Sequence, residues 1–192
     1  LGNHSLRRPE IADYLDENEF IIRPCNYHPS APGNGSVILD KGKNRVAIIN
    51  LQGAVYLDNI INPFDSIDEE IEKVKNDGAN IIIVDFHAEA TGEKKGMGFY
   101  LDGKVSAVFG THTHTQTADE QILPNGTGYI TDIGMTGPYY SVLGVTPEVA
   151  IQKMKTNLPV RFTNPDGPCT MEGVVIEIDD RTGKTTHIER FR

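Results

Sequence analysis

Two predominantly apolar runs in the middle of the chain predict buried strands. The first, Asn80 to His87, contains three isoleucines and a valine in a row, so it lacks the apolar–polar alternation of a strand with one solvated face. The second, Val105 to Phe109, is shorter and equally apolar. Runs of this kind are typical of parallel strands covered on both faces. We therefore expect both in the centre of an α/β sheet.

Apolar positions with helical spacing predict a helix that begins at Ser66. Ser66 and Glu69 match a capping box, and Gly78 suits the C-terminal stop. The apolar stripe of this helix is Ile67, Ile71 and Val74. Further helices are expected at Glu10 to Glu19, at Lys94 to Leu101, and after an N-cap at Thr146 with Pro147 at the first position. The apolar positions of the last of these include Val149, Ala150 and Met154.

The remaining apolar segments are short and predict hairpins and single strands. Together with the strand–helix–strand unit that ends at His87, they indicate an α/β fold with mixed sheets. With 192 residues, we expect one domain over residues 1–192. The expected hairpins pair Ser36–Asp40 with Arg45–Leu51 and Gly173–Ile178 with Thr185–Phe191, and the single strands are Phe20–Pro24 and Tyr129–Ile133.

Composition narrows the classes of partner. The net charge of -9 opposes binding to nucleic-acid polymers or to anionic membranes, since both need basic excess. No apolar stretch approaches the ~20 residues of a membrane span. The two cysteines, Cys25 and Cys169, stand in unrelated contexts, so no cysteine metal site is expected. Low cysteine usage fits a reducing compartment, and we expect a cytoplasmic protein.

Histidines follow both buried strands. His87 ends the first strand on the same face as Asp85, which could orient its imidazole. His112 and His114 follow the second strand, and an extended His-x-His would place both rings on one side. Ligands of open α/β sheets bind beyond the carboxyl ends of the strands, and imidazole suits Zn, Fe, Mn and Ni. The alternative is that these are polar loop histidines, or a strand-end histidine that is merely hydrogen-bonded.

A third piece of candidate chemistry lies at Gly2-Asn3-His4. The Asn3 carbonyl is a hard oxygen ligand, and the adjacent His4 could serve as an acid or electrophile. Such a triplet alone is usually an ordinary turn. A catalytic-looking loop without a preceding strand also leads us to expect an amino-terminal segment upstream of Leu1.

Longer motifs carry a family resemblance. The segments are Asp85 to Thr91, Gly110 to Asp119, Thr131 to Pro138 and Thr156 to Phe162. With them, the chain resembles the YmdB-like bacterial metallophosphoesterases, a branch of the calcineurin-like superfamily. The resemblance implies a sandwich of two mixed β-sheets flanked by helices, with a dinuclear metal centre at the strand ends. It also implies an amino-terminally shortened domain.

The resemblance assigns roles residue by residue. It implies that Asn3, His87 and His112 bind one metal ion, that His114 binds the other, and that His4 is the catalytic acid. The cofactors would be two divalent or trivalent ions, Fe or Mn first and Zn as a further candidate. The implied activity is hydrolysis of small phosphodiesters, including cyclic nucleotides such as cAMP or 2',3'-cyclic types. A homo-oligomer is compatible with the sequence.

Two departures and two rivals accompany this interpretation. The family's upstream Asp ligand and bridging Glu have no counterpart here, so the chain as given is expected to bind at most one ion tightly and to be a poor or inactive catalyst. Ser5-Leu6-Arg7 stands where the family has a small residue, an aromatic and an acid, so Arg7 either holds an anionic phosphate or is a solvated surface residue.

Two alternative functions remain open. The chain could be a capsule-synthesis-type calcineurin-like protein, or a catalytically impaired fragment or binding module. His28 and His187 match no metal motif.

Overall fold

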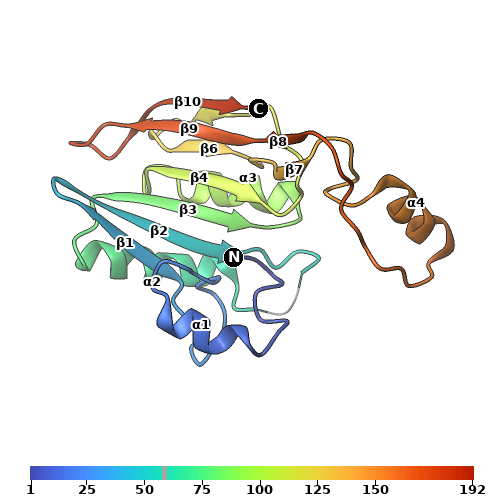
Figure 1. Ribbon diagram of the computed structural model, residues 1–192. Helices are drawn as coiled ribbons and strands as arrows, with labels where there is room; N and C mark the ends of the chain where they lie inside the picture. The colour runs from blue at the N-terminus through green and yellow to red at the C-terminus, as the bar shows by residue number, and fades with distance from the viewer. Residues whose placement is uncertain (58–59) are drawn as a thin grey trace.

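The computed structural model describes residues 1–57 and 60–192, and a six-stranded mixed sheet forms its centre. The strand order is β1-β2-β3-β4-β6-β5, with β2, β3, β4 and β6 parallel and the edge strands β1 and β5 antiparallel (Figure 1). The bounds are β1 Ser36–Lys41, β2 Asn44–Gln52, β3 Ile81–His87, β4 Ala107–Thr111, β5 Gln121–Ile122 and β6 Gly128–Ile130. The predicted first hairpin and both buried strands are thus confirmed.

Helices α2 (Pro63–Asn76) and α3 (Thr91–Tyr100) cover one face of this sheet (Figure 1). The predicted apolar stripe of α2 is buried there, because helical spacing brings its members to one side. The main core lies between these helices and the sheet. Its members include Ile67, Ile71, Val74, Val84, Phe86, Met97 and Leu101.

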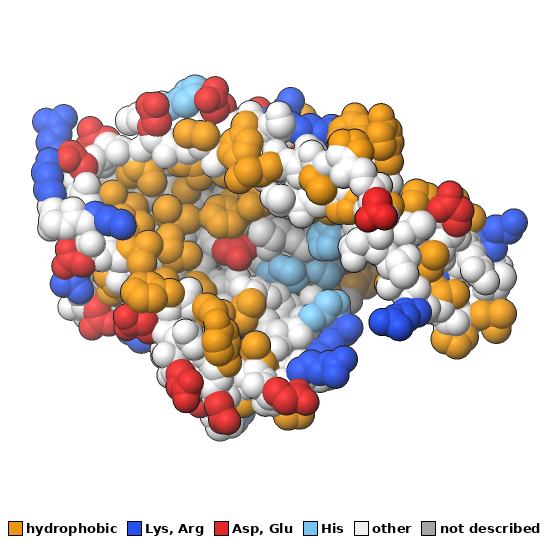
Figure 2. All heavy atoms as spheres, in the orientation of Figure 1, with side chains coloured by type: hydrophobic (Ala, Val, Ile, Leu, Met, Phe, Trp, Pro, Cys, Tyr) orange, Lys and Arg blue, Asp and Glu red, His pale blue; other side chains and the backbone are white. Residues whose placement is uncertain are grey.

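The opposite face of the sheet is less covered than the apolar runs suggest. Along β3, Ile82, Val84 and Phe86 are buried, whereas the alternate residues Ile83 and His87 are only partly buried. The expectation that β3 is covered on both faces is therefore wrong within the described residues. Figure 2 shows hydrophobic side chains in a hollow on this face, with histidines at its edge. Asp85 and His87 lie on this face.

Two antiparallel pairs accompany the central sheet. The predicted C-terminal hairpin is confirmed as β9 (Gly173–Ile178) and β10 (Thr185–Phe191), which lie beside β6 (Figure 1). The Thr185 hydroxyl donates to the Ser106 carbonyl at 2.7 Å, which fastens the hairpin to the sheet. The second pair is β7 (Thr136–Pro138) with β8 (Cys169–Met171), which periodicity does not predict.

Helix α4 (Pro147–Thr156) projects from the rest of the molecule (Figure 1). It begins where Thr146 and Pro147 predict. The Thr146 hydroxyl does not cap it, however, because that hydroxyl bonds to the Thr163 carbonyl at 3.0 Å. Ala150 is its buried residue, and Met154 is 69% exposed.

Several predicted boundaries need correction. Helix α2 begins at Pro63 rather than at Ser66, because the Asn62 side chain accepts from the Phe64 N–H, and Ser66 donates to the Asn62 carbonyl. Helix α3 likewise begins at Thr91 rather than Lys94. The expected helix at Glu10 to Glu19 is present as the shorter α1 (Ile11–Glu17).

The predicted strand at Phe20 to Pro24 is wrong. This segment begins with a turn, in which the Ile21 N–H bonds to the Asn18 carbonyl. The Arg23 N–H donates to the Asn34 carbonyl at 2.9 Å, but Pro24 has no N–H with which to extend a ladder. No helix of the described residues is long and apolar enough to cross a membrane.

Candidate metal centre

Three distant segments meet at the carboxyl end of the central sheet. His87 ends β3 and is in register with Thr111, the last residue of β4. The chain then continues directly to His112, while the N-terminal turn places Asn3 beside His87. Parallel neighbouring strands end at one edge of a sheet, which is why residues so far apart in sequence come together here.

The contacts between these side chains are direct. His87 Nε2 lies 3.0 Å from His112 Nδ1 and 3.1 Å from Asn3 Oδ1. The two imidazole rings meet edge to face, with centroids 4.7 Å apart. Two nitrogens bound at about 2.0–2.1 Å to one tetrahedral ion lie roughly 3.3 Å apart. Of the four residues expected to converge here, Asn3, His87 and His112 do so, at spacings close to those of metal ligands, whereas His114 makes no hydrogen bond to His87 in the described part of the chain.

The hydrogen bonds around His87 fix which of its nitrogens carries the proton. Thr111 donates its hydroxyl proton to Asp85 Oδ1 at 2.8 Å, so its oxygen can only accept from His87 Nδ1, 3.1 Å away. This assignment, drawn from the network, leaves a lone pair on His87 Nε2. The Asn3 carbonyl oxygen also carries lone pairs, so two acceptors face each other. A cation between them would satisfy both.

His112 is oriented by Glu89. Its Nε2 lies 3.0 Å from Glu89 Oε2, and donation there leaves the Nδ1 lone pair directed toward His87. Sequence reasoning missed both Glu89 and Thr111. Glu89 lies two residues beyond the end of β3, inside the Asp85 to Thr91 motif. This position near a strand end was the feature of the sequence that could have marked Glu89 as a site residue.

Burial keeps both imidazoles neutral, the form that binds metals. The pKa of His87 is lowered to about 3, first by burial and then by the neighbouring His112 ring, since two adjacent imidazoles resist being protonated together. Burial also lowers the pKa of His112, although Glu89 opposes the shift. The pKa of Asp85 is raised by burial against hydrogen bonds from Thr111 and Asn50. The sequence suggested that Asp85 contacts His87 directly. In the structure Asp85 instead acts on His87 through Thr111.

The geometric argument from an extended His-x-His is wrong. His112 has φ 100° and His114 has φ 61°, so the chain leaves the sheet in a left-handed conformation. His114 Nδ1 lies 3.2 Å from the Leu143 carbonyl, and within the described residues the His114 ring makes no hydrogen bond to His87 or His112. His4 is exposed, and its ring bonds to no residue in the described part of the chain.

A buried ion pair holds the loop that carries His112 and His114. Lys94 Nζ lies 2.7 Å from Asp132 Oδ2, with both side chains 1% exposed, and it also donates to the Thr111 carbonyl at 2.8 Å. Asp132 Oδ2 in turn accepts from the Thr113 N–H and hydroxyl at 3.1 and 2.8 Å. These bonds stabilise the left-handed backbone on either side of Thr113.

The donor set fits one metal ion with open coordination positions. Within residues 1–57 and 60–192, no group of three or more His, Cys, Asp or Glu side chains is placed to hold a metal. Three donors are reached only by counting the Asn3 amide oxygen. A second ion at His114 therefore stays a prediction. His28 bonds to Ser30 in its loop and His187 is half-exposed on β10, so both lie outside this cluster.

Comparison with known proteins identifies relatives that span the whole chain. The YmdB-like protein family matches residues 1–191. The 2',3'-cyclic-nucleotide 2'-phosphodiesterase of Bacillus subtilis (strain 168) is 49% identical over 191 residues, which are 100% of this chain and 72% of that protein.

Two solved structures share the fold. A hypothetical protein from Thermus thermophilus has a TM-score of 0.91 at 36% identity, covering 100% of this chain and 73% of its own. A novel phosphatase from Mycoplasma pneumoniae has a TM-score of 0.88 at 34% identity, covering 99% and 69%. The chain therefore belongs to the YmdB-like protein family and has the calcineurin-like α/β fold that its motifs implied.

Proposed function

We propose that this protein is a metal-dependent phosphodiesterase that hydrolyses small phosphodiesters, 2',3'-cyclic nucleotides among them. The observation that carries the proposal is the close approach of three metal-binding atoms, with Asn3 Oδ1 and His112 Nδ1 lying 3.1 and 3.0 Å from His87 Nε2. The name of the Bacillus subtilis relative supports the substrate class.

In this proposal His87, His112 and Asn3 hold one ion, and Thr111 and Glu89 fix the two rings. Such an ion would lower the pKa of a water molecule and neutralise charge on the phosphate. Imidazole and amide donors suit Fe, Mn and Zn, so the residues do not select among these metals. A second ion would take His114 as a ligand.

His4 is the proposed general acid. It follows Asn3 in the same N-terminal turn, and its exposed ring is free to donate a proton to the departing alkoxide. General acid catalysis of this kind contributes roughly 10²–10⁴-fold. This corresponds to about 3–5 kcal/mol of barrier.

The test separates metal binding from proton donation. We expect His112→Ala to lose both bound metal and hydrolysis of 2',3'-cyclic AMP. His4→Asn should keep its metal and lose about 10²–10⁴-fold in turnover, because only proton donation is removed. His187→Ala is the matched control and should change neither. Metal content and initial rates are measured on the same samples.

The leaving group provides the decisive comparison. A nitrophenyl phosphodiester releases an acidic phenol that hardly needs a proton, so His4→Asn should lose much less on it. Equal losses on both substrates at full metal content would make His4 a positioning residue. A protein without metal-dependent hydrolysis of either substrate would overturn the proposed function.

A further inference from the structure

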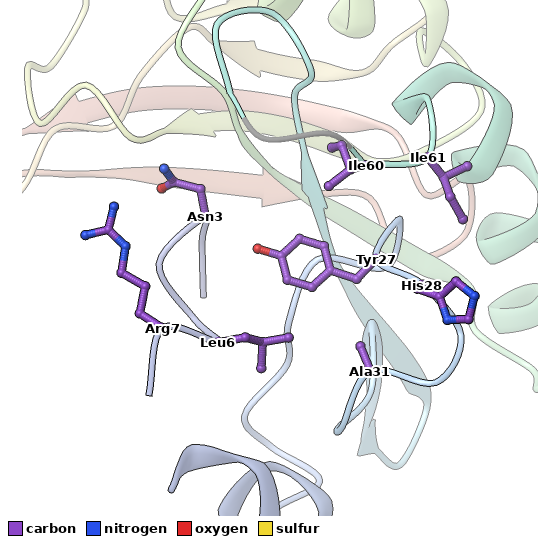
Figure 3. Close-up of a pocket in the computed structure, with 8 residues that line it drawn as sticks. All are labelled: Asn3, Leu6, Arg7, Tyr27, His28, Ala31, Ile60 and Ile61. Atoms are coloured by element: carbon purple, nitrogen blue, oxygen red, sulfur yellow. The ribbon is translucent and has the colours of Figure 1, made fainter. Parts of the chain in front are cut away.

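A cavity of about 750 Å³ opens beside the candidate metal centre and shares Asn3 with it. The N-terminal turn forms one wall with Leu6 and Arg7, and the other walls come from residues 27–31 and from Ile60 and Ile61 (Figure 3). This volume lies within the range of about 300–1,000 Å³ that is typical of small-molecule sites.

The cavity has a polar end and an apolar end. Figure 3 shows the Asn3 amide and the Arg7 guanidinium together at one end, with Ile60, Ile61 and the His28 ring at the other. Tyr27 lies between them, and its hydroxyl is 2.9 Å from Gln52 Oε1 and 3.3 Å from the Gly2 carbonyl. These contacts fix the ring between the two ends.

This polarity matches the shape of a nucleotide. The anionic part would lie at the metal centre, where Arg7 adds a positive charge in a chain whose net charge is -9. The flat, weakly polar base would lie against Leu6, Ile60 and Ile61.

We propose that this cavity binds the nucleoside part of a cyclic nucleotide substrate, an inference that rests on the proposed function. The base packs against Leu6, Ile60 and Ile61, and the Arg7 guanidinium donates to the phosphate or to the ribose next to it. Of the two interpretations that the sequence leaves for Arg7, the phosphate-binding one follows from its place on the cavity wall.

The first test measures nucleoside binding without phosphate or metal. Adenosine is titrated into the chelator-treated protein, and saturation transfer to the base protons is recorded by NMR. We expect transfer in the native protein and in Ile151→Asp, the control at an exposed isoleucine of α4 outside the cavity. Ile61→Asp should weaken binding about tenfold, since a charge replaces an apolar contact. Leu6→Asp serves the same purpose if Ile61→Asp fails to fold.

The second test compares matched substrates. Adenosine 2',3'-cyclic phosphate and methyl riboside 2',3'-cyclic phosphate share the reacting group, and only the first has a base. Ile61→Asp should lower the ratio of their kcat/KM values about tenfold, or about 1.4 kcal/mol. Arg7→Glu should raise KM for both substrates about tenfold, whereas Arg8→Glu, the same charge change at a neighbour outside the cavity, should leave KM unchanged.

The experiments distinguish failure of the nucleoside site from failure of the proposed phosphodiesterase activity. Hydrolysis with an unchanged ratio in Ile61→Asp, or equal adenosine binding by Ile61→Asp and the native protein, overturns the nucleoside site and leaves the phosphodiesterase standing. Absence of hydrolysis in the native protein, with adenosine binding that depends on Ile61, overturns the activity and supports the cavity as a nucleoside site.

Discussion

At the scale of single residues, Gly2 controls how closely the N-terminal turn approaches His87. A Cβ at this position would lie 2.3 Å from Cε1 and from Nε2 of the His87 ring. We therefore predict that Gly2→Ala displaces Asn3 and weakens metal binding about tenfold or more, in the range found for disturbed metal environments. Metal-binding titration checks this. Gly92→Ala, where a Cβ meets nothing within 4 Å, should bind metal normally.

The two cysteines should differ in reactivity. Burial raises the pKa of the Cys25 thiol to about 12, and the negative charge of Glu70 adds to the shift, whereas Cys169 is exposed. At about pH 8 we predict that a disulfide reagent labels Cys25 about a hundredfold more slowly than Cys169. The pKa of Cys25 is higher in the folded than in the unfolded protein, so the protonated thiol favours the folded state. This contribution to the free energy of unfolding is complete below the unfolded thiol's pKa and is lost as the pH rises toward 12. Similar labelling rates in the folded protein would contradict the burial of Cys25.

The sequence predicts part of this site because strand ends meet. The positions of His87 and His112 after two apolar runs were enough to expect their convergence. Their hydrogen-bond partners Thr111 and Glu89 were not predictable, since these depend on strand register and on the loop after β3. The same limit explains why an extended His112-x-His114 was wrongly expected, since the left-handed backbone at both residues depends on tertiary contacts.

At the scale of elements, Lys94 ties α3 to the loops after β4 and β6. Removing one partner of a buried ion pair leaves the other charge uncompensated. We predict that Lys94→Met lowers the free energy of unfolding by about 3–5 kcal/mol, because Asp132 then stays buried without its cation. Denaturant titration measures the change.

The neighbouring residue is the control for this prediction. Lys95 is half-exposed and lies 3.6 Å from Asp119, so Lys95→Met should change stability by about 1 kcal/mol or less. Equal effects at Lys94 and Lys95 would show that the buried pair does not stabilise the fold.

Elements with strong periodicity were predictable and short ones were not. The apolar stripe of α2 and the runs of β3 and β4 identified their elements, because burial against one core imposes the pattern. The brief strands β7 and β8 depend on pairing with each other rather than on local sequence. Phe20 to Pro24 looked like a strand because of its apolar residues, but it lacks a partner ladder.

At the scale of the whole molecule, the segment around α4 is an arm with closely spaced ends. The Thr146 N–H donates to the Thr163 carbonyl at 2.8 Å, so both ends of the arm lie together. We predict that replacing residues 147–162 with a short Gly-Ser linker changes the free energy of unfolding by about 1 kcal/mol or less, because the main core lies elsewhere. Thermal and denaturant unfolding test this. A loss of about 3 kcal/mol or more would show that the arm is part of the core.

The position of a bound ion decides whether Asn3, His87 and His112 form a metal centre. Crystals of the protein grown with Mn²⁺ should give an anomalous peak bonded to His87 Nε2, His112 Nδ1 and Asn3 Oδ1, each at about 2.0–2.3 Å. Thr111 should still accept from His87 Nδ1, and Glu89 from His112 Nε2. A fully occupied ion elsewhere with this position empty, or an ion bound through the opposite nitrogens of these rings, would contradict the proposed metal centre.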